Sequence, residues 1–138
     1  MRNTEPLKLD LDTRFLTEYF YSQNRELRQQ ARRKMEELIE SGDGIIPTMA
    51  LCELIRLVCS TDGKERAERV YSSLIESGIK IESLTPYIAK EAGILKSAHR
   101  NVPVGDCIIA ATAIKNQAKI ISDDPHFDTI KETKRTWL

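Results

Sequence analysis

The segment VPVGDCIIAATAIKNQAKIISDD, residues 102–124, decides the fold of this chain. Its first part, residues 102–117, is apolar on most sides when it is drawn as a helix, which predicts a helix in the centre of the molecule. Its second part, AKIIS at 118–122, has the length and the aliphatic content of a buried strand. Two acidic residues follow directly. The segment therefore predicts a central helix, a buried strand and a polar group at the carboxyl end of that strand.

The same alternation of strands and helices extends from this segment along the whole chain. Strands are predicted at 7–11, 44–47, 79–83 and 118–122, with a last edge strand at 135–138. Helices are predicted between them, at 13–23, 25–41, 48–60, 62–77, 86–99 and 102–117. Strands that alternate with helices are typical of a parallel sheet covered on both sides. We therefore predict a three-layer α/β/α sandwich with a mostly parallel sheet of four to five strands.

Composition limits the class of protein. The chain has 138 residues and 41% apolar residues, which predicts a single domain over 1–138 with a real core. The 21 basic residues balance the 21 acidic ones, which excludes nucleic-acid binding by bulk positive charge alone. No apolar run approaches the roughly 18 residues of a membrane span, and the N-terminus lacks a signal core. Three cysteines without a CxxC pair argue against disulfides or zinc, so we expect a reducing, cytoplasmic setting without membrane contact.

Acidic residues stand where the predicted strands end. Asp12 follows the first strand, and Asp123 and Asp124 follow the fourth. Active sites of parallel α/β sheets lie beyond the carboxyl ends of the strands, at the point where the strand order reverses. The alternative is structural, because an aspartate also caps a helix, as Asp12 could, and Asp-Pro initiates turns. Position alone leaves both interpretations open.

Two further acids lie in predicted helices. Asp106 is in the first turn of the apolar helix 102–117, where it could simply complement the helix dipole. A charge beside a buried surface needs a partner, however, and a cation shared with other acids would supply one. Glu53 falls opposite the apolar stripe of its helix, which is typical of a solvated carboxylate. Its place shortly after the strand 44–47 makes it a second candidate.

The residue types indicate which metal such a cluster would bind. The chain has only two histidines, His99 and His126, so we expect a site made of carboxylates. Carboxylate oxygens without histidine or cysteine favour Mg²⁺ or Mn²⁺. Acids packed together repel one another, and one or two divalent ions relieve that repulsion. Such a site suits phosphoryl chemistry.

Four short motifs occur in the order that is seen in PIN-domain nucleases. They are LDT at 11–13, CEL at 52–54, GDCIIAATA at 105–113 and ISDDPHF at 121–127. Over residues 7–137 the chain therefore resembles that family, whose common small members are the VapC-like toxins of type II toxin–antitoxin pairs. The resemblance implies a ribonuclease that hydrolyses RNA phosphodiester bonds with a water activated by Mg²⁺ or Mn²⁺. It also implies a homodimer and an antitoxin protein as a partner.

The resemblance also assigns roles to single residues. Asp12, Glu53, Asp106 and Asp124 would be the catalytic, metal-binding acids, and Asp123 could take part in place of Asp124. Thr13 and Ser122 would be supporting hydroxyls. Arg14 stands where the family often has a small polar residue, which leaves the handling of the substrate open. Arg14, Lys96 and Arg100 are the predicted substrate contacts.

Two other functions compete with the nuclease. Asp10-Leu11-Asp12 after a first strand is similar to the nucleophile motif of haloacid-dehalogenase-like phosphatases, with Asp10 as the nucleophile and Asp12 as the general acid. Against it, Thr13 follows Asp12 one residue too early, and GDCIIAATA has no role there. The structural alternative for Asp10 is an outward-facing polar position in the strand. A non-catalytic PIN-like binding module is the second competitor.

Overall fold

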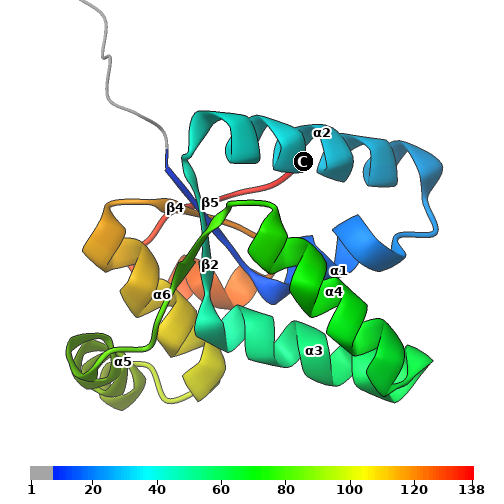
Figure 1. The fold of residues 1–138 in the computed structure, drawn as a ribbon. Coiled ribbons are helices and arrows are strands. Elements are labelled where there is room, and N and C mark those ends of the chain that lie inside the picture. Colours follow the sequence, from blue (N-terminus) through cyan, green and yellow to red (C-terminus); the bar gives the residue numbers. More distant parts are fainter. Residues whose placement is uncertain (1–7) are drawn as a thin grey trace, which may run out of the picture.

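The computed structural model describes residues 8–138, and its centre is one parallel sheet (Figure 1). Leu7, the first residue of the predicted strand 7–11, lies outside the described residues. The strands are β1 (Leu9–Leu11), β2 (Gly44–Pro47), β3 (Lys80–Glu82), β4 (Lys119–Ile121) and β5 (Arg135–Thr136). Their order in the sheet is β3-β2-β1-β4-β5, and all four pairings are parallel. The predicted edge strand near the C-terminus is confirmed as β5.

Helices cover both faces of this sheet. They are α1 (Thr13–Tyr21), α2 (Arg25–Ser41), α3 (Thr48–Asp62), α4 (Lys64–Glu76), α5 (Pro86–Ala98), α6 (Val104–Asn116) and the 3-10 helix η1 (Pro125–Thr129). Helices α1, α2 and α4 lie on one side of the sheet and α5 and α6 on the other, while α3 leaves the carboxyl end of β2 (Figure 1). The predicted three-layer α/β/α sandwich is thereby confirmed.

Local chemistry sets the ends of these helices. The Asn24 side chain accepts a hydrogen bond from the Leu27 N–H at the start of α2, and Thr85 does the same for Ile88 at the start of α5. At the end of α2, Gly42 adopts a φ of 76°, a left-handed conformation that glycine enters without strain. Helix α2 has its predicted bounds, α3 extends two residues beyond its prediction, and the ends of the other helices lie no more than two residues inside theirs, because periodicity does not register the caps.

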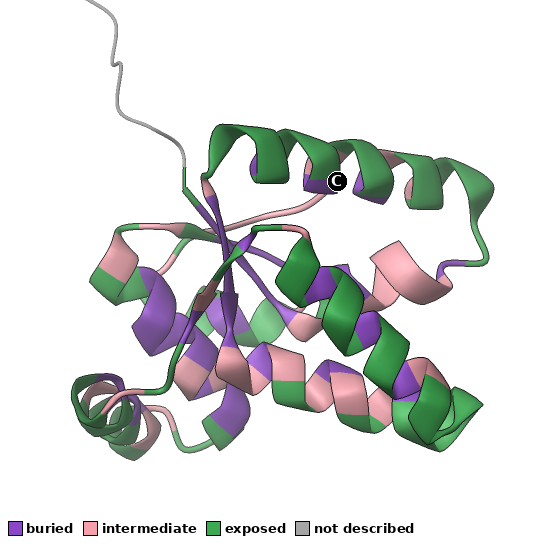
Figure 2. Cartoon of the chain, viewed as in Figure 1, coloured by how far each residue is buried: buried purple, intermediate pink, exposed green. Residues whose placement is uncertain are grey.

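Helix α6 is the most buried helix, as its all-round apolar sequence predicted (Figure 2). It packs on the sheet face that carries Asp10 and Asp12, since Lys115 near its end lies 2.6 Å from Glu82 on the same face. Its buried residues are Gly105, Cys107, Ile109, Ala110, Ala111, Thr112 and Ala113. The first turn of α6 is thus held firmly next to the carboxyl ends of the strands.

The strand order reverses between β1 and β4. From β1 the chain builds the sheet outward through β2 and β3, and then crosses back to add β4 on the other side of β1. Leu11 pairs with Ile121, so the next residues, Asp12 and Ser122, lie side by side. This is the switch point at which α/β sheets place their ligands. No helix within residues 8–138 combines the length and the apolar content required to span a bilayer.

Candidate functional site

Ser122 joins the two strand ends at the switch point. Its side chain is completely buried, and its Oγ donates to Asp12 Oδ2 at 2.6 Å. The same oxygen accepts from the backbone N–H of Asp124 at 3.0 Å. Asp12 occupies the N-cap position of α1 but makes no capping hydrogen bond with its side chain. The side-chain hydrogen bond from Ser122 thus ties the Asp12 carboxylate to the end of β4.

Asp12 is a carboxylate in an unfavourable electrostatic position. Its pKa is raised to about 6: burial is the largest cause, the hydrogen bond from Ser122 lowers the pKa, and the negative charge of Asp106 raises it. The side chain is only 2% exposed, so water contributes little to stabilising its charge. A cation placed beside Asp12 and Asp106 would relieve both the burial and the repulsion.

Asp106 connects the other acids. It lies in the first turn of α6, and its side chain is 15% exposed. Burial raises its pKa, as does the negative charge of Asp124, and Glu53 adds a smaller effect in the same direction. The contact with His126 acts in the opposite direction. The structure therefore brings Asp12, Asp106, Asp124 and Glu53 into one electrostatically coupled group.

Glu53 enters this group from α3. Its Oε1 accepts a hydrogen bond from Thr13 Oγ1 at 2.6 Å, so the alternative of a freely solvated carboxylate is wrong. Its Oε2 lies beside Gly105, where an added Cβ would come within 3.1 Å of Oε2 and within 2.9 Å of Met49 Cε. The glycine before Asp106 leaves the space in which Glu53 approaches the first turn of α6.

A histidine that the sequence pattern did not indicate, His126, also lies in the cluster. The Nδ1 atom of His126 is 3.2 Å from Asp106 Oδ2 and 3.2 Å from Asp124 Oδ1. Ligand atoms of Asp106, Asp124 and His126 all lie within 4.8 Å of one another. The metal site made of carboxylates stays a prediction, and the structure adds the nitrogen atom of a histidine beside two of the acids. The available signal was the Asp-Pro turn, which reverses the chain and returns the second residue after Asp124 to the pocket.

Asp123 points to a different partner. Arg14 donates two hydrogen bonds to it, at 2.8 and 3.1 Å, and this guanidinium holds the pKa of Asp123 below its ordinary value. The geometry thus places Asp124, and not Asp123, beside Asp106. A phosphate contact of Arg14 stays a prediction, and its side chain is 60% exposed.

Two of the predicted substrate contacts, Lys96 and Arg100, lie shortly before α6, and Lys96 makes hydrogen bonds within the protein. Lys96 Nζ donates to the carbonyl oxygens of Arg100 and Val102, at 2.8 and 2.9 Å, and so holds the turn between α5 and α6. Arg100 is an exposed residue of that turn. The part of these two residues in substrate binding stays a prediction.

Asp10 does not face solvent. Its side chain is 0% exposed, and neither carboxylate oxygen has a hydrogen-bond partner. Burial raises its pKa well above the ordinary value, and the charges of Asp12 and Glu82 add to this. The alternative of an outward-facing polar position is therefore wrong. The phosphatase interpretation is also wrong, because a nucleophile must reach its substrate and Asp10 cannot.

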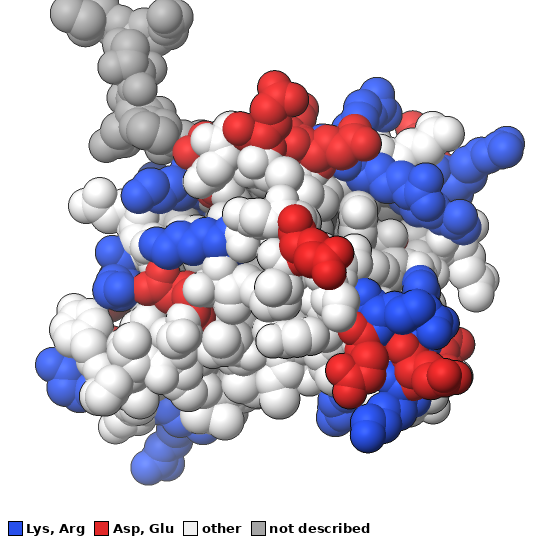
Figure 3. All heavy atoms as spheres, in the orientation of Figure 1, with Lys and Arg blue, Asp and Glu red and all other residues white. Residues whose placement is uncertain are grey.

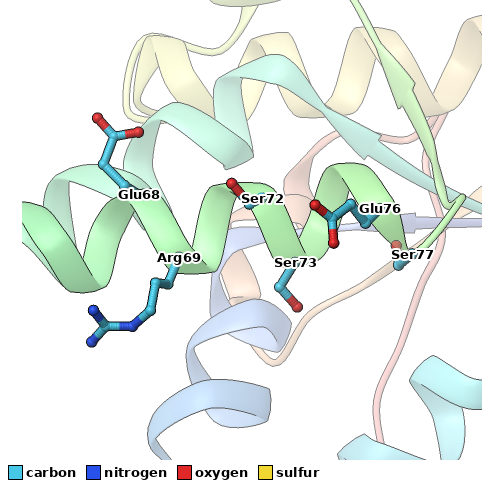
Figure 4. A pocket seen from close by; sticks show the side chains of 6 residues that line it. All are labelled: Glu68, Arg69, Ser72, Ser73, Glu76 and Ser77. Carbon is cyan, nitrogen blue, oxygen red and sulfur yellow. The ribbon is translucent and has the colours of Figure 1, made fainter.

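Other surface features do not compete with this cluster. Figure 4 shows a hollow along α4, but its polar side chains follow one helix and do not converge on a point. Basic side chains gather at the N-terminal end of α2 and acidic ones at its other end (Figure 3). The exposed basic residues there are Arg25, Arg28, Arg32 and Arg33. This separation offers a local positive surface on a chain with no net charge.

The donor set at the switch point fits a divalent metal ion. Carboxylates from β1, α3, α6 and the β4–η1 turn supply oxygen ligands, which Mg²⁺ and Mn²⁺ prefer. Burial and the repulsion among these acids raise the pKa values of Asp12 and Asp106, and a bound cation would offset both effects. The arrangement can hold a cation and present it, with a water molecule, to a phosphate group.

Comparisons with known proteins agree with this description. A family model of the PIN domain matches residues 11–132. Sequence comparison with curated proteins finds no match. Among solved structures, VapBC2 from Rickettsia felis, bound to a DNA fragment of its promoter, has a TM-score of 0.76 at 17% identity, covering 96% of this chain and 99% of that chain.

Two further solved structures are similar to the chain. DNA-bound VapBC from Salmonella typhimurium has a TM-score of 0.75 at 19% identity, covering 96% of this chain and 98% of that chain. Mycobacterium tuberculosis VapC20, described as a sarcin-ricin loop cleaving toxin, has a TM-score of 0.72 at 16% identity, covering 89% and 95%. At these identities the likeness shows a shared fold.

Proposed function

Because the chain belongs to the PIN domain family, we propose that it is a metal-dependent endoribonuclease, the toxin of a type II toxin–antitoxin pair. The observation that carries the proposal is the convergence of Asp12, Asp106 and Asp124 at the switch point of the sheet, with the pKa of Asp12 raised to about 6. Acids whose pKa values are shifted by burial and by one another are typical of functional sites.

In this proposal the four acids Asp12, Glu53, Asp106 and Asp124 hold one or two Mg²⁺ or Mn²⁺ ions. The bound metal supplies a nucleophilic water near neutral pH and stabilises negative charge on phosphate oxygens. Ser122 orients Asp12 through its hydrogen bond of 2.6 Å, and Thr13 orients Glu53 in the same way. The protein thus positions its ligands before the RNA binds, and no covalent enzyme intermediate is required.

Two protein partners belong to the same proposal. The structures from Rickettsia felis and Salmonella typhimurium are VapBC assemblies bound to DNA, which supports an antitoxin protein as the partner of this chain. We also propose a homodimer. Tyr87, Ile94 and Ile114 on α5 and α6 are 53%, 58% and 38% exposed and line one shared hollow, which supports an interface there.

RNA cleavage by the purified protein tests the enzymatic proposal. A structured RNA is incubated with wild type in Mg²⁺ or Mn²⁺, and in parallel with EDTA. We expect cleavage that EDTA abolishes and that Asp106→Asn lowers at least about a hundredfold, because the variant loses a negatively charged ligand. Asp43→Asn is the matched control, since Asp43 directly precedes β2 and so lies at the amino ends of the strands, away from the acid cluster at their carboxyl ends.

Other results would reject this function. Cleavage that persists in Asp106→Asn indicates a contaminant or a different site. A folded protein that neither binds a divalent metal nor cleaves RNA is a non-catalytic binding module, which is the remaining competing function.

A further inference from the structure

His126 occupies a position between two of the four acids. Its Nδ1 lies 3.2 Å from an oxygen of Asp106 and 3.2 Å from an oxygen of Asp124. One N–H group points at one acceptor, and only the contact with Asp106 has the geometry of a hydrogen bond. A hydrogen bond accounts for the approach to Asp106, while the approach to Asp124 is set by the turn in which both residues lie.

The backbone fixes this position of the imidazole. Asp124 Oδ1 accepts the backbone N–H of His126 at 2.9 Å, while Pro125 begins η1. The carboxylate and the imidazole thus come from one short turn, and the turn itself is tied to β4 through Ser122. Because the turn is locked at both ends, His126 keeps its place over the acids without contributing to the core; its side chain is 47% exposed.

The distances match those between neighbouring ligands of one cation. Atoms about 2.1 Å from an octahedral ion stand roughly 3 Å apart when they are neighbours in the octahedron. Nδ1 of His126 is 3.2 Å from each of the two carboxylate oxygens. Among residues 8–138, Asp106, Asp124 and His126 form the one group of three or more such residues that offers, one from each residue, potential ligand atoms lying within 4.8 Å of one another.

We propose that His126 is a nitrogen ligand of the divalent metal held by Asp106 and Asp124. This inference rests on the proposed function of that site and deepens it. Imidazole binds first-row transition metals in preference to Mg²⁺, which selects oxygen ligands. The site therefore discriminates in favour of Mn²⁺ over Mg²⁺ more strongly than a site of carboxylates alone.

Metal binding, measured without any substrate, tests this ligand. The variant His126→Asn keeps a polar side chain of similar shape and replaces the ring nitrogen by an amide. His99→Asn is the matched control, because the Nδ1 of His99 lies 2.9 Å from the carbonyl oxygen of Leu95 at the end of α5. Calorimetry gives the Kd for Mn²⁺ and for Mg²⁺, and pulsed EPR of bound Mn²⁺ detects coupling to ¹⁴N of an imidazole.

We expect a ¹⁴N coupling in wild type and in His99→Asn that is absent in His126→Asn. We also expect His126→Asn to weaken Mn²⁺ binding about tenfold or more while changing the Kd for Mg²⁺ far less. Circular dichroism confirms that each variant is folded.

Two results separate this inference from the proposed function. If wild type binds Mn²⁺ and cleaves RNA but shows no imidazole coupling, and His126→Asn keeps the wild-type Kd, the histidine is not a ligand and the nuclease stands. If wild type binds neither ion, both the inference and the metal-dependent nuclease fail.

Discussion

Asp10 is the residue whose chemistry departs most from its surroundings. Its carboxyl group is fully buried and has no hydrogen-bond partner, and burial raises its pKa well above the ordinary value. An acid with a raised pKa in the folded state binds its proton more tightly there than in the unfolded chain. Its contribution to stability is therefore present at low pH, and it is lost as the pH rises through the folded-state pKa.

This predicts the behaviour of Asp10→Asn. An amide cannot ionise, so the variant should lose less unfolding free energy than wild type between pH 5 and pH 8. We expect the difference at pH 8 to be on the order of 1 kcal/mol or more, because an unpaired buried charge costs more than an unpaired amide. Urea unfolding at several pH values measures it. Parallel curves for the two proteins would contradict the assignment, and Glu68→Gln, at an exposed position of α4, serves as the control.

Sequence predicts single site residues only where their position along the chain is informative. Asp12 and Asp124 follow strands directly, so a topological rule is enough to propose them. His126 and Asp10 required three-dimensional information. His126 reaches the cluster through a turn, and Asp10 is buried because α6, more than ninety residues later in the sequence, covers that face of the sheet.

At the scale of elements, the start of α6 affects both the packing of the protein and the geometry of the acid cluster. Gly105 leaves the space that Glu53 Oε2 occupies, since an added Cβ would come within 3.1 Å of it. In an exposed helix the change from glycine to alanine stabilises by about 1 kcal/mol. At Gly105 the crowding of Glu53 and Met49 offsets that gain.

Two glycine variants make this testable. We expect Gly93→Ala, in α5 with nothing within 4 Å of the added Cβ, to raise the unfolding free energy by about 0.5–1 kcal/mol. We expect Gly105→Ala to give no such gain. It should lower the rate of RNA cleavage by about tenfold, because the added Cβ would displace the Glu53 carboxylate and a misplaced group slows the reaction. Thermal unfolding and the cleavage assay measure the two effects. Equal gains in stability with full activity in both variants would show that Gly105 has no part in placing Glu53.

The elements themselves followed from the sequence with small errors. Aliphatic runs of strand length and the all-round apolar helix at 102–117 are strong patterns, because burial selects the same residue types at every position. The register in which β1 pairs with β4 could not be predicted from these side-chain patterns. Three-residue strands pair through backbone groups, which every sequence offers.

At the scale of the whole molecule, the acid cluster links metal binding to stability and pH. Burial raises the pKa of Asp12 to about 6, so in the metal-free protein Asp12 lowers stability as the pH rises from about 4 to 6. A divalent ion needs the deprotonated carboxylate and removes this loss.

We therefore expect Mn²⁺ to raise the Tm of wild type, and to raise it more at pH 7.5 than at pH 5. At Mn²⁺ one hundred times its Kd the gain is about 2.7 kcal/mol. Differential scanning fluorimetry at both pH values measures it, and Asp106→Asn should respond much less. An identical gain at both pH values would exclude Asp12 from the metal site.

The layered architecture was predictable because alternating strands and helices leave few arrangements open. The strand order and the switch point, by contrast, depend on how distant segments meet. The composition of the site depends on these long-range contacts, since its four acids come from four separate parts of the chain.

The most direct test of the metal centre is the anomalous scattering of Mn²⁺ in crystals of the wild-type protein. We predict a peak in contact with the carboxylates of Asp106 and Asp124, on the side where Asp12 lies. No peak at saturating Mn²⁺, or a peak only at carboxylates elsewhere on the surface, would contradict a catalytic metal at the switch point of the sheet.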